Sequence, residues 1–471
     1  MSNAPLWTFD ELVRASNGRP EGATGAPVTG LSIDTRTLAR GDLFVALKDQ
    51  RDGHAFVGNA FEAGAAAALV SEGYEAGPND GPLIRVPDTL AGLEAIARAA
   101  RARLSAEARV IAVTGSAGKT GTKDMLRAAL SRIGLAHAAD KSFNNHWGVP
   151  LTLARMPAET RFGIFEIGMN HAGEITPLVK LVRPHIAIVT TVEPVHLAQF
   201  PSVEAIAEAK AEIFLGLEPG GTAIVNRDNT HFETLRARAE AAGARIVSFG
   251  QEARADLRPK VLELSSEGTV IELVVGGRNV HFRVAVPGIH IARNALAVAA
   301  AVDAAGADVE EALEALATLP PPPGRGSRSE LPLAGGKVLL IDESYNANPA
   351  SMRAALAVLG TVPRAVYNRR IAVLGDMLEL GAQEKTHHAA LKDAVDAAGV
   401  DLVFACGPNM AHLFEALAPA RQGAWEPTAE ALAGRLFAVL QPADVVMIKG
   451  SNGSRMGPLA EALRRKLNAG S

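Results

Sequence analysis

The stretch Thr114-Gly-Ser-Ala-Gly-Lys-Thr120 decides the fold, because it lies between a strand-like apolar run and a helix-like stretch. Gly115 and Gly118 allow a turn whose N–H groups face inward, and the helix that follows directs its positive dipole end to the same point. Lys119 adds a charge suited to the β- and γ-phosphates of a nucleotide, and the Thr120 hydroxyl suits Mg²⁺. The sequence thus predicts a phosphate loop formed by Gly115, Ser116, Ala117, Gly118, Lys119 and Thr120.

Composition limits the classes of protein. The chain has 471 residues, which suggests about three domains. A formal net charge of −4 and an aromatic content of 4% argue against a nucleic-acid-binding protein. Cys406, the single cysteine, allows no internal disulfide and is expected in a buried strand. The N-terminus lacks the features of a signal peptide, and no uncharged apolar run reaches about 18 residues, so we expect a soluble cytoplasmic protein without membrane insertion.

Strand and helix patterns change along the chain. Short apolar strands precede an Ala-rich helix over Leu90–Leu104, which predicts a small α/β domain. From Arg109 onward, apolar strands alternate with amphipathic helices, as in a parallel sheet with right-handed crossovers. Between Lys260 and Val286 the period is two, so a small antiparallel sheet is expected to be attached here.

The clearest boundary is Leu319-Pro-Pro-Pro-Pro-Gly-Arg-Gly-Ser-Arg328. Its prolines remove N–H donors and stiffen the segment, which suits a hinge between domains. A second alternating block follows, with strands expected at Val338–Ile341, Ile371–Leu374, Leu402–Ala405 and Val445–Ile448.

Two side chains follow strand ends near the phosphate loop. Glu166 stands near the end of an apolar run, where a carboxylate would ligate Mg²⁺, although a lone acid at a strand end is as often merely solvated. His196 follows another strand and could serve a metal or a phosphate, but an isolated loop histidine usually has no such role.

Lys210 projects from the apolar face of an expected helix, beside Ile206 and Ile213. Glu208 and Glu212 are two positions away and point elsewhere, so the helix offers no i,i+4 ion pair. Two interpretations stay open, namely a lysine whose stem lies along the core while its amine reaches water, and a lysine with a role in the site.

Asp342-Glu-Ser-Tyr-Asn-Ala-Asn-Pro349 follows a strand and leads into a helix that Asn348 can cap. Capping does not explain Asp342, Tyr345 and Asn346, whose carboxylate, ring and amide are the groups needed to hold a ribose and an adenine. Asn294 lies in an Ala-rich helix and needs a partner, either a structural one or a base edge.

Together these motifs resemble the Mur ligase family, ATP-dependent enzymes that add amino acids to the peptidoglycan precursor. Within it, the blocks Glu166-Ile-Gly-Met-Asn-His171 and Ser344-Tyr-Asn-Ala-Asn-Pro349 are similar to those of the branch that adds D-alanyl-D-alanine. The resemblance covers nearly the whole chain and also includes Asp34-Thr-Arg36, Asp52-Gly-His54, Phe143-Asn-Asn-His-Trp-Gly-Val-Pro150, Gly375-Asp-Met-Leu-Glu-Leu-Gly381 and Lys449-Gly-Ser451.

The resemblance implies an α/β protein of three domains. These are an N-terminal domain for the UDP-linked substrate over residues 1–106, a central ATP-binding domain over 107–324, and a C-terminal Rossmann-like domain over 325–471. The central domain would hold a P-loop-type parallel sheet with the small antiparallel sheet attached.

The resemblance also implies roles for individual residues. Lys119 and Thr120 would serve the phosphates and Mg²⁺, Glu166 and His196 the metal ions, and Lys210 matches a lysine that is carbamylated in this family and then serves a second Mg²⁺. The nucleotide would be held by Asn294, Arg325, Asp342, Tyr345 and Asn346. The remaining substrates would be held by Ser32, Thr35 and Arg36 at the uridine, Asn144 and Asn145 at the muramoyl group, and Lys449 and Ser451 at D-Ala-D-Ala.

The implied reaction uses ATP and Mg²⁺ to join D-Ala-D-Ala to UDP-N-acetylmuramoyl-tripeptide through an acyl phosphate, with a monomeric enzyme expected. One alternative is another amide ligase with the same ATP-binding module, such as a folylpolyglutamate synthase or a different Mur ligase. The Asp34-Thr-Arg36 and Asp52-Gly-His54 segments oppose it. A second alternative is a nucleotide-binding regulatory module without ligase chemistry, which the presence of Lys119, Glu166 and Lys210 opposes.

Overall fold

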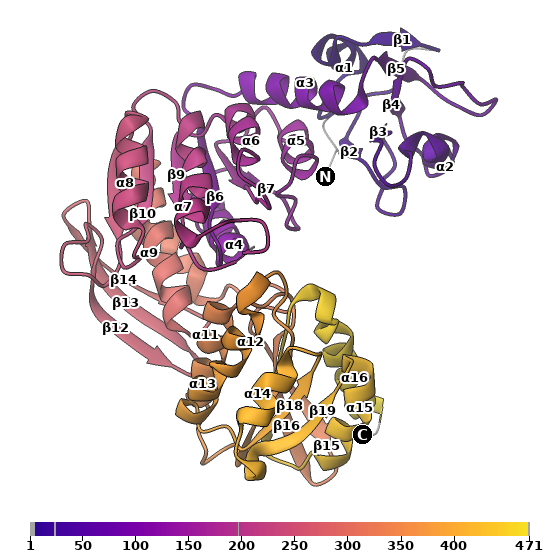
Figure 1. Cartoon of the computed structure of the whole chain (residues 1–471). Helices are drawn as coiled ribbons and strands as arrows, with labels where there is room; N and C mark the ends of the chain where they lie inside the picture. The colour runs from indigo at the N-terminus through magenta and orange to yellow at the C-terminus, as the bar shows by residue number, and fades with distance from the viewer. Residues whose placement is uncertain (1–4, 23–24, 196, 470–471) are drawn as a thin grey trace.

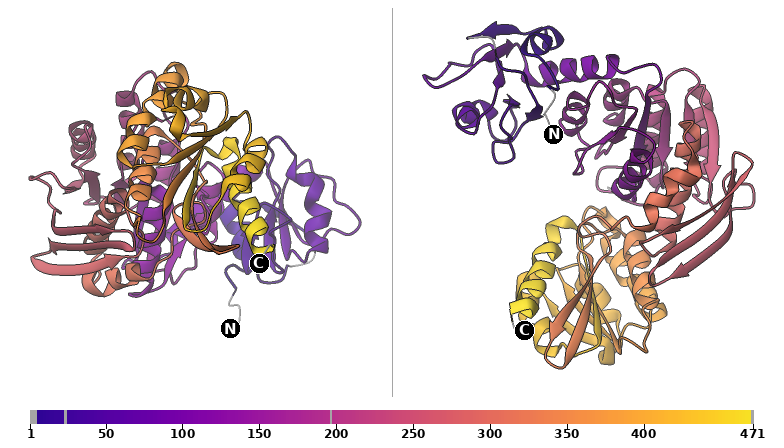
Figure 2. Two further views of the ribbon diagram at one scale, coloured as in Figure 1. Left: turned by 90° about the horizontal axis from the view of Figure 1, so that it is seen from below. Right: turned by 180° about the vertical axis from the view of Figure 1, so that it is seen from behind.

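The computed structural model describes residues 5–22, 25–195 and 197–469. Its elements form an N-terminal, a central and a C-terminal body that follow one another along the chain (Figure 1). The views from below and from behind show that the C-terminal body packs against the central one, and that the N-terminal body sits at the opposite end (Figure 2). None of the helices in the described ranges is both long and apolar enough to cross a membrane.

The N-terminal body contains a five-stranded sheet in the order β1-β5-β4-β3-β2, in which only β1 is antiparallel to its neighbour. Helix α3 leads from this sheet to the central body (Figure 1). The elements are α1 (Phe9–Ser16), β1 (Arg19–Glu21), β2 (Gly30–Ser32), β3 (Asp42–Val45), α2 (Val57–Glu62), β4 (Ala67–Ser71), β5 (Leu83–Val86) and α3 (Thr89–Ala102).

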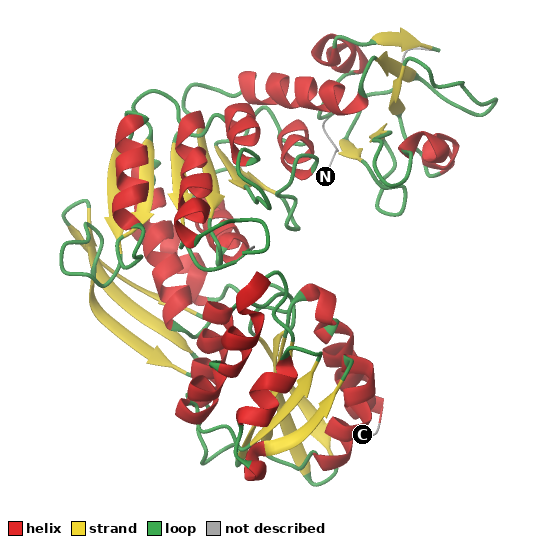
Figure 3. Cartoon of the chain, in the orientation of Figure 1, coloured by secondary structure: helices red, strands yellow, loops and turns green. Residues whose placement is uncertain are grey.

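The central body is built on a fully parallel six-stranded sheet in the order β11-β10-β9-β6-β8-β7. Helices cover both faces (Figure 3). Its elements are β6 (Arg109–Thr114), α4 (Lys119–Ser131), β7 (Ala136–Ala138), α5 (Gly148–Ala154), β8 (Phe162–Glu166), α6 (Ile175–Val182), β9 (Ile186–Val189), α7 (Val203–Ala211), β10 (Thr222–Asn226), α8 (Phe232–Ala241), β11 (Arg245–Phe249), α9 (Ile289–Ala304) and α10 (Val309–Leu313).

A three-stranded antiparallel sheet is attached to the central body, as the period of two predicts. Its strands are β12 (Pro259–Ser265), β13 (Gly268–Val275) and β14 (Arg278–Val284). The inward side chains Ile271 and Phe282 join the same apolar core as Leu126 of α4 and Val298 of α9, so this sheet belongs to the central core.

The C-terminal body has a six-stranded sheet in the order β15-β16-β20-β17-β18-β19, parallel except for β15. Its elements are β15 (Ser327–Leu333), β16 (Gly336–Glu343), α11 (Pro349–Gly360), β17 (Arg369–Gly375), α12 (Glu384–Ala389), α13 (Leu391–Ala397), β18 (Leu402–Cys406), α14 (Met410–Ala416), β19 (Gln422–Glu426), α15 (Ala429–Val439), β20 (Asp444–Lys449) and α16 (Met456–Ala469). Cys406 is buried at the end of β18, as predicted.

The expected alternation of strands and helices is confirmed in both halves. The Pro-rich segment contains no helix or strand up to Gly326, but its last two residues belong to β15, where Ser327 pairs with Asp342. The segment up to Gly326 thus connects the two bodies without regular secondary structure, and β15 already pairs along the edge of the C-terminal sheet.

Candidate functional site

The predicted phosphate loop connects β6 to α4. Gly115 and Gly118 have φ values of +147° and +83°, the region that favours glycine. A Cβ atom on Gly115 would lie 1.9 Å from Thr190 Oγ1, so the loop also packs directly against the chain after β9. Ser116 ties the loop to the same region, because Glu193 N donates to its Oγ over 2.9 Å.

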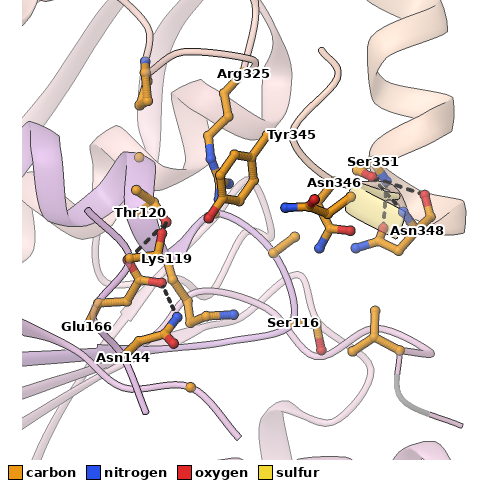
Figure 4. A pocket seen from close by; sticks show the side chains of 18 of the residues that line it. Ser116, Lys119, Thr120, Asn144, Glu166, Arg325, Tyr345, Asn346, Asn348 and Ser351 are labelled. Atoms are coloured by element: carbon orange, nitrogen blue, oxygen red, sulfur yellow. Dashed lines mark hydrogen bonds between the residues drawn. The ribbon is translucent and has the colours of Figure 1, made fainter. Parts of the chain in front are cut away.

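Glu166, at the end of β8, meets the first turn of α4. The Thr120 hydroxyl donates to Glu166 Oε2 over 2.9 Å, and Asn144 Nδ2 donates to Oε1 over 2.7 Å (Figure 4). The residue is 4% exposed, so the alternative of a merely solvated acid is wrong. Ser142, whose Oγ lies 3.0 Å from Thr120 Oγ1, completes the group but was absent from the sequence predictions because it stands just before the quoted Phe143 motif.

Two lysine amines lie in this region. Lys119 Nζ donates to Gly115 O over 2.7 Å, and burial lowers its pKa while Glu166 opposes the shift. Lys210 is 2% exposed, and burial and the charge of Lys119 hold its pKa well below the ordinary value. With only 2% of the residue exposed, Lys210 does not extend along the surface, which argues against the interpretation in which its amine reaches out to water.

The carboxylates of the Lys210 helix point away from it, as predicted. Glu208 pairs with Arg238, and Glu212 accepts hydrogen bonds from Gly173 N and Thr176 N. Within the described residues, Lys210 Nζ has no hydrogen-bond or ion-pair partner.

One cavity of about 980 Å³ unites the phosphate loop with the C-terminal body. Tyr345 and Arg325 lie on its far wall, with the guanidinium 4.2 Å from the centre of the tyrosine ring. Asn294 of α9 approaches the loop so closely that a Cβ on Gly118 would lie 2.6 Å from its Nδ2. The predicted residues that line this cavity are Ser116, Ala117, Gly118, Lys119, Thr120, Asn144, Asn145, Glu166, Asn294, Arg325, Tyr345, Asn346, Lys449 and Ser451.

Several predicted side chains already have structural partners. Asp342 is not part of the cavity wall, because its carboxylate binds Arg464 of α16 over 2.7 Å and Ser344. Lys449 donates to Asn346 O over 3.0 Å and lies 3.3 Å from Glu343 Oε2. The side chain of Asn145 accepts hydrogen bonds from the amides at the start of α5.

The predicted uridine residues lie in the N-terminal body and do not line this cavity. Ser32 is buried at the end of β2, and its hydroxyl donates to Asp34 O over 3.0 Å. Arg36, with an 86% exposed side chain, pairs with Asp34, and Thr35 lies between them. His196, the other predicted metal ligand, falls outside the described residues.

His290 lines the cavity but was not singled out as a site residue. Its Nδ1 is buried without a hydrogen-bond partner in the described structure, and burial lowers its pKa. Its position four residues before Asn294 on the same helix was the only signal in the sequence.

Two family models match the chain. The Mur ligase middle domain matches residues 113–302, and the Mur ligase, glutamate ligase domain matches residues 328–452. Over 459 residues the chain is 36% identical to the UDP-N-acetylmuramoyl-tripeptide--D-alanyl-D-alanine ligase of Escherichia coli, covering 97% of this chain and 98% of that protein. The corresponding ligase of Bacillus subtilis is 35% identical, and the match covers 86% of this chain and 85% of that protein.

Solved structures agree with this similarity. A crystal structure of MurF from Acinetobacter baumannii matches with a TM-score of 0.84 at 29% identity, covering 98% of this chain and all of that one. A structure of the MurF ligase from Thermotoga maritima in complex with ADP matches in fold, with a TM-score of 0.76 at 24% identity over 94% and 98% of the two chains.

Proposed function

The chain belongs to the Mur ligase family, and from this premise we propose that it joins D-alanyl-D-alanine to UDP-N-acetylmuramoyl-tripeptide at the expense of ATP. The γ-phosphoryl group of ATP is transferred to the terminal carboxylate of the tripeptide, which gives an acyl phosphate and ADP. The amine of D-Ala-D-Ala then attacks the acyl carbon, the new amide forms, and phosphate leaves.

The observation that supports this function best is the single cavity shared by two bodies. The phosphate loop and Glu166 lie on the central side, while Tyr345, Asn346 and Ser451 lie on the C-terminal side. Positioning substrates next to one another in such a cavity can contribute about 7–11 kcal/mol to lowering the barrier. Because one chain supplies all these groups, we propose that the enzyme acts as a monomer, and that it works in the cytoplasm.

The donor atoms around the phosphate loop fit Mg²⁺. The Thr120 hydroxyl and the Glu166 carboxylate are oxygen ligands 2.9 Å apart and buried beside Lys119. No group of three His, Cys, Asp or Glu side chains suited to a metal occurs in the part of the chain that the structure describes. This agrees with Mg²⁺, which usually keeps waters and phosphate oxygens as ligands and needs only one or two protein groups.

The surroundings of Lys210 suit carbamylation of its amine. A buried amine with a lowered pKa is unprotonated more often than an exposed one and can therefore attack CO₂. The N–C bond forms, one proton leaves, and the product is an anionic group near Lys119. That carbamate, together with His196, would supply ligands for a second Mg²⁺ and would balance the positive charge of this region.

We propose three domains with separate roles. Residues 1–106 bind the UDP end of the substrate, residues 107–324 bind ATP, and residues 325–471 close the cavity. Ser32, Thr35 and Arg36 hold the uridine, and Asn144 and Asn145 the muramoyl group. Asn294, Arg325, Tyr345 and Asn346 surround the nucleotide, whereas Asp342, bound to Arg464 and Ser344, has a structural role at the end of β16. Lys449 and Ser451 contact D-Ala-D-Ala.

The decisive experiment measures phosphate release from ATP and Mg²⁺ with UDP-N-acetylmuramoyl-tripeptide, with and without D-Ala-D-Ala. We expect release only when both substrates are present, and a UDP-muramoyl-pentapeptide by mass spectrometry. A Lys119→Ala variant should lose at least about 100-fold in kcat, since the lysine neutralises charge during phosphoryl transfer. Release without any amine would instead support a nucleotide switch, and release with other amines only would support a different ligase.

A further inference from the structure

The loop over residues 376–380, between β17 and the short turn before α12, forms part of the cavity wall through Leu378, Glu379 and Leu380. The loop also touches the central body, because Ala198 N donates to Glu379 O over 3.4 Å. Glu379 has a φ of +66°, so the backbone turns sharply at this contact. The position of this loop therefore determines the shape of the cavity on its C-terminal side.

Three consecutive residues of the loop are held by hydrogen bonds from outside it. Ser451 N donates to Asp376 O over 3.0 Å, and Leu378 N donates to Ser451 Oγ over 3.0 Å. Between them, Met377 N donates to His388 Nε2 over 2.9 Å. Ser451 and His388 thus bind consecutive residues of the loop.

His388 is fully buried on α12 and does not line the cavity. Its Nδ1 lies 2.7 Å from Glu384 O, and since a carbonyl can only accept, Nδ1 must carry the proton. Nε2 is then left with the lone pair that the Met377 amide requires. Both ring nitrogens are satisfied only by the neutral imidazole in this one tautomer.

The titratable groups near His388 are Asp376, Glu384, His387 and His412, and burial lowers the pKa of the imidazole. Asp376 Oδ1 lies 4.0 Å from Nε2, but this carboxylate accepts the amides of Met410 over 2.8 Å and Asn409 over 3.3 Å. Asp376 therefore anchors the start of α14, and His388 remains the acceptor for the loop.

We propose that His388 is a positioning residue for the ligase reaction, because its Nε2 fixes the Met377 amide and so holds residues 378–380 and Ser451 in the wall of the cavity. The inference rests on the proposed function, in which Ser451 contacts D-Ala-D-Ala. Without the hydrogen bond to His388, the Met377 N–H would be unpaired, and the loop would shift towards a new acceptor. The phosphate loop, on the other body, keeps its own contacts.

Two substitutions of His388 test the hydrogen bonds of its two ring nitrogens separately. In His388→Asn the short amide can still donate to Glu384 O but cannot reach Met377 N, whereas in His388→Gln the amide oxygen stands near the place of Nε2. The matched control is His387→Asn on the same helix, because the Nε2 of His387 has no hydrogen-bond partner in the described residues. Each variant is assayed as the full-length enzyme with all three substrates.

We expect His388→Asn to raise KM for D-Ala-D-Ala about tenfold, the cost of one unsatisfied buried donor, with KM for ATP nearly unchanged. His388→Gln and His387→Asn should stay close to the wild type. An unchanged KM for D-Ala-D-Ala in His388→Asn, an equal rise for ATP, or a His388→Gln variant as impaired as His388→Asn would overturn the proposal.

Amide hydrogen exchange gives a readout that needs no activity. The segment over residues 376–380 should exchange faster in His388→Asn than in His387→Asn, while the phosphate loop exchanges at the same rate in both. An unchanged exchange rate in this segment would contradict the positioning role of His388, whatever reaction the wild type catalyses. Failure of this proposal can therefore be distinguished from failure of the proposed ligase function.

Discussion

Lys210 is the residue whose chemistry depends most on its surroundings. A lysine normally remains charged and in contact with water, yet this one is 2% exposed and lies near a second amine, that of Lys119. Two neighbouring amines repel one another when both are charged, and burying a charge without a partner costs free energy. A carbamate turns one of them into an anion and removes this conflict.

Replacing Lys210 by Ala or Met is therefore expected to lower kcat at least about 100-fold, because the anionic oxygen that stabilises the transition state is lost. Acetate or formate should partly restore the activity of Lys210→Ala, whose cavity leaves room for the ion, but not that of Lys210→Met. In the wild type, ¹³C-bicarbonate should give a carbamate NMR signal that both variants lack. Full activity of Lys210→Ala would contradict the carbamate.

At the scale of elements, the junction between β6 and α4 has the tightest geometry in the site. Gly118 caps α4 in a left-handed conformation, and the side chain of Asn294 from α9 lies directly against it. The same close approach brings the positive end of α4 and the side-chain amide of Asn294 together, so that both can take part in the proposed nucleotide site.

Gly118→Ala is expected to raise KM for ATP at least about tenfold, because a Cβ costs roughly 1–2 kcal/mol at this φ and displaces Asn294. The control is Gly434→Ala in the middle of α15, where a Cβ meets nothing within 4 Å. That substitution should stabilise the protein by up to about 1 kcal/mol and leave KM for ATP unchanged. Equal effects of the two substitutions, measured by kinetics and thermal unfolding, would show that the left-handed cap is unimportant.

At the scale of the whole molecule, contacts of Arg103, the residue just after α3, connect the N-terminal body to the central one. The guanidinium of Arg103 stacks 3.6 Å from the centre of the Trp7 ring and donates to Leu6 O and Met156 O. Trp7 Nε1 in turn donates to Ala154 O over 2.9 Å. These contacts join the first residues described to helix α5 of the central body.

Arg103→Ala is expected to lower the free energy of unfolding by about 2–3 kcal/mol, since it removes two hydrogen bonds and the stacked guanidinium. KM for UDP-N-acetylmuramoyl-tripeptide should rise more than KM for ATP, because only the former spans both bodies. Arg98→Ala on the same helix removes an exposed ion pair with Glu94 and should change stability by less than about 1 kcal/mol. Similar unfolding midpoints for the two variants would argue against a fastening role.

The sequence alone determined the features that depend on short stretches of chain. The phosphate loop needs only two glycines, a lysine and a threonine between a strand and a helix, and these are neighbours in the sequence. The parallel sheets follow from apolar runs that alternate with amphipathic helices, because a strand buried on both faces must be apolar throughout. Similarity to a known family then added roles that the patterns could not supply.

In the C-terminal sheet, the two strands that were not predicted, β15 and β19, are both at the edges. An edge strand is partly exposed and therefore lacks the continuous apolar run that marks a central strand. The tertiary structure alone decided these pairings. It also decided the contacts between distant residues, such as Asp342 with Arg464 and Met377 with His388, because a charge or a ring nitrogen acquires its role only from the atoms that folding brings beside it.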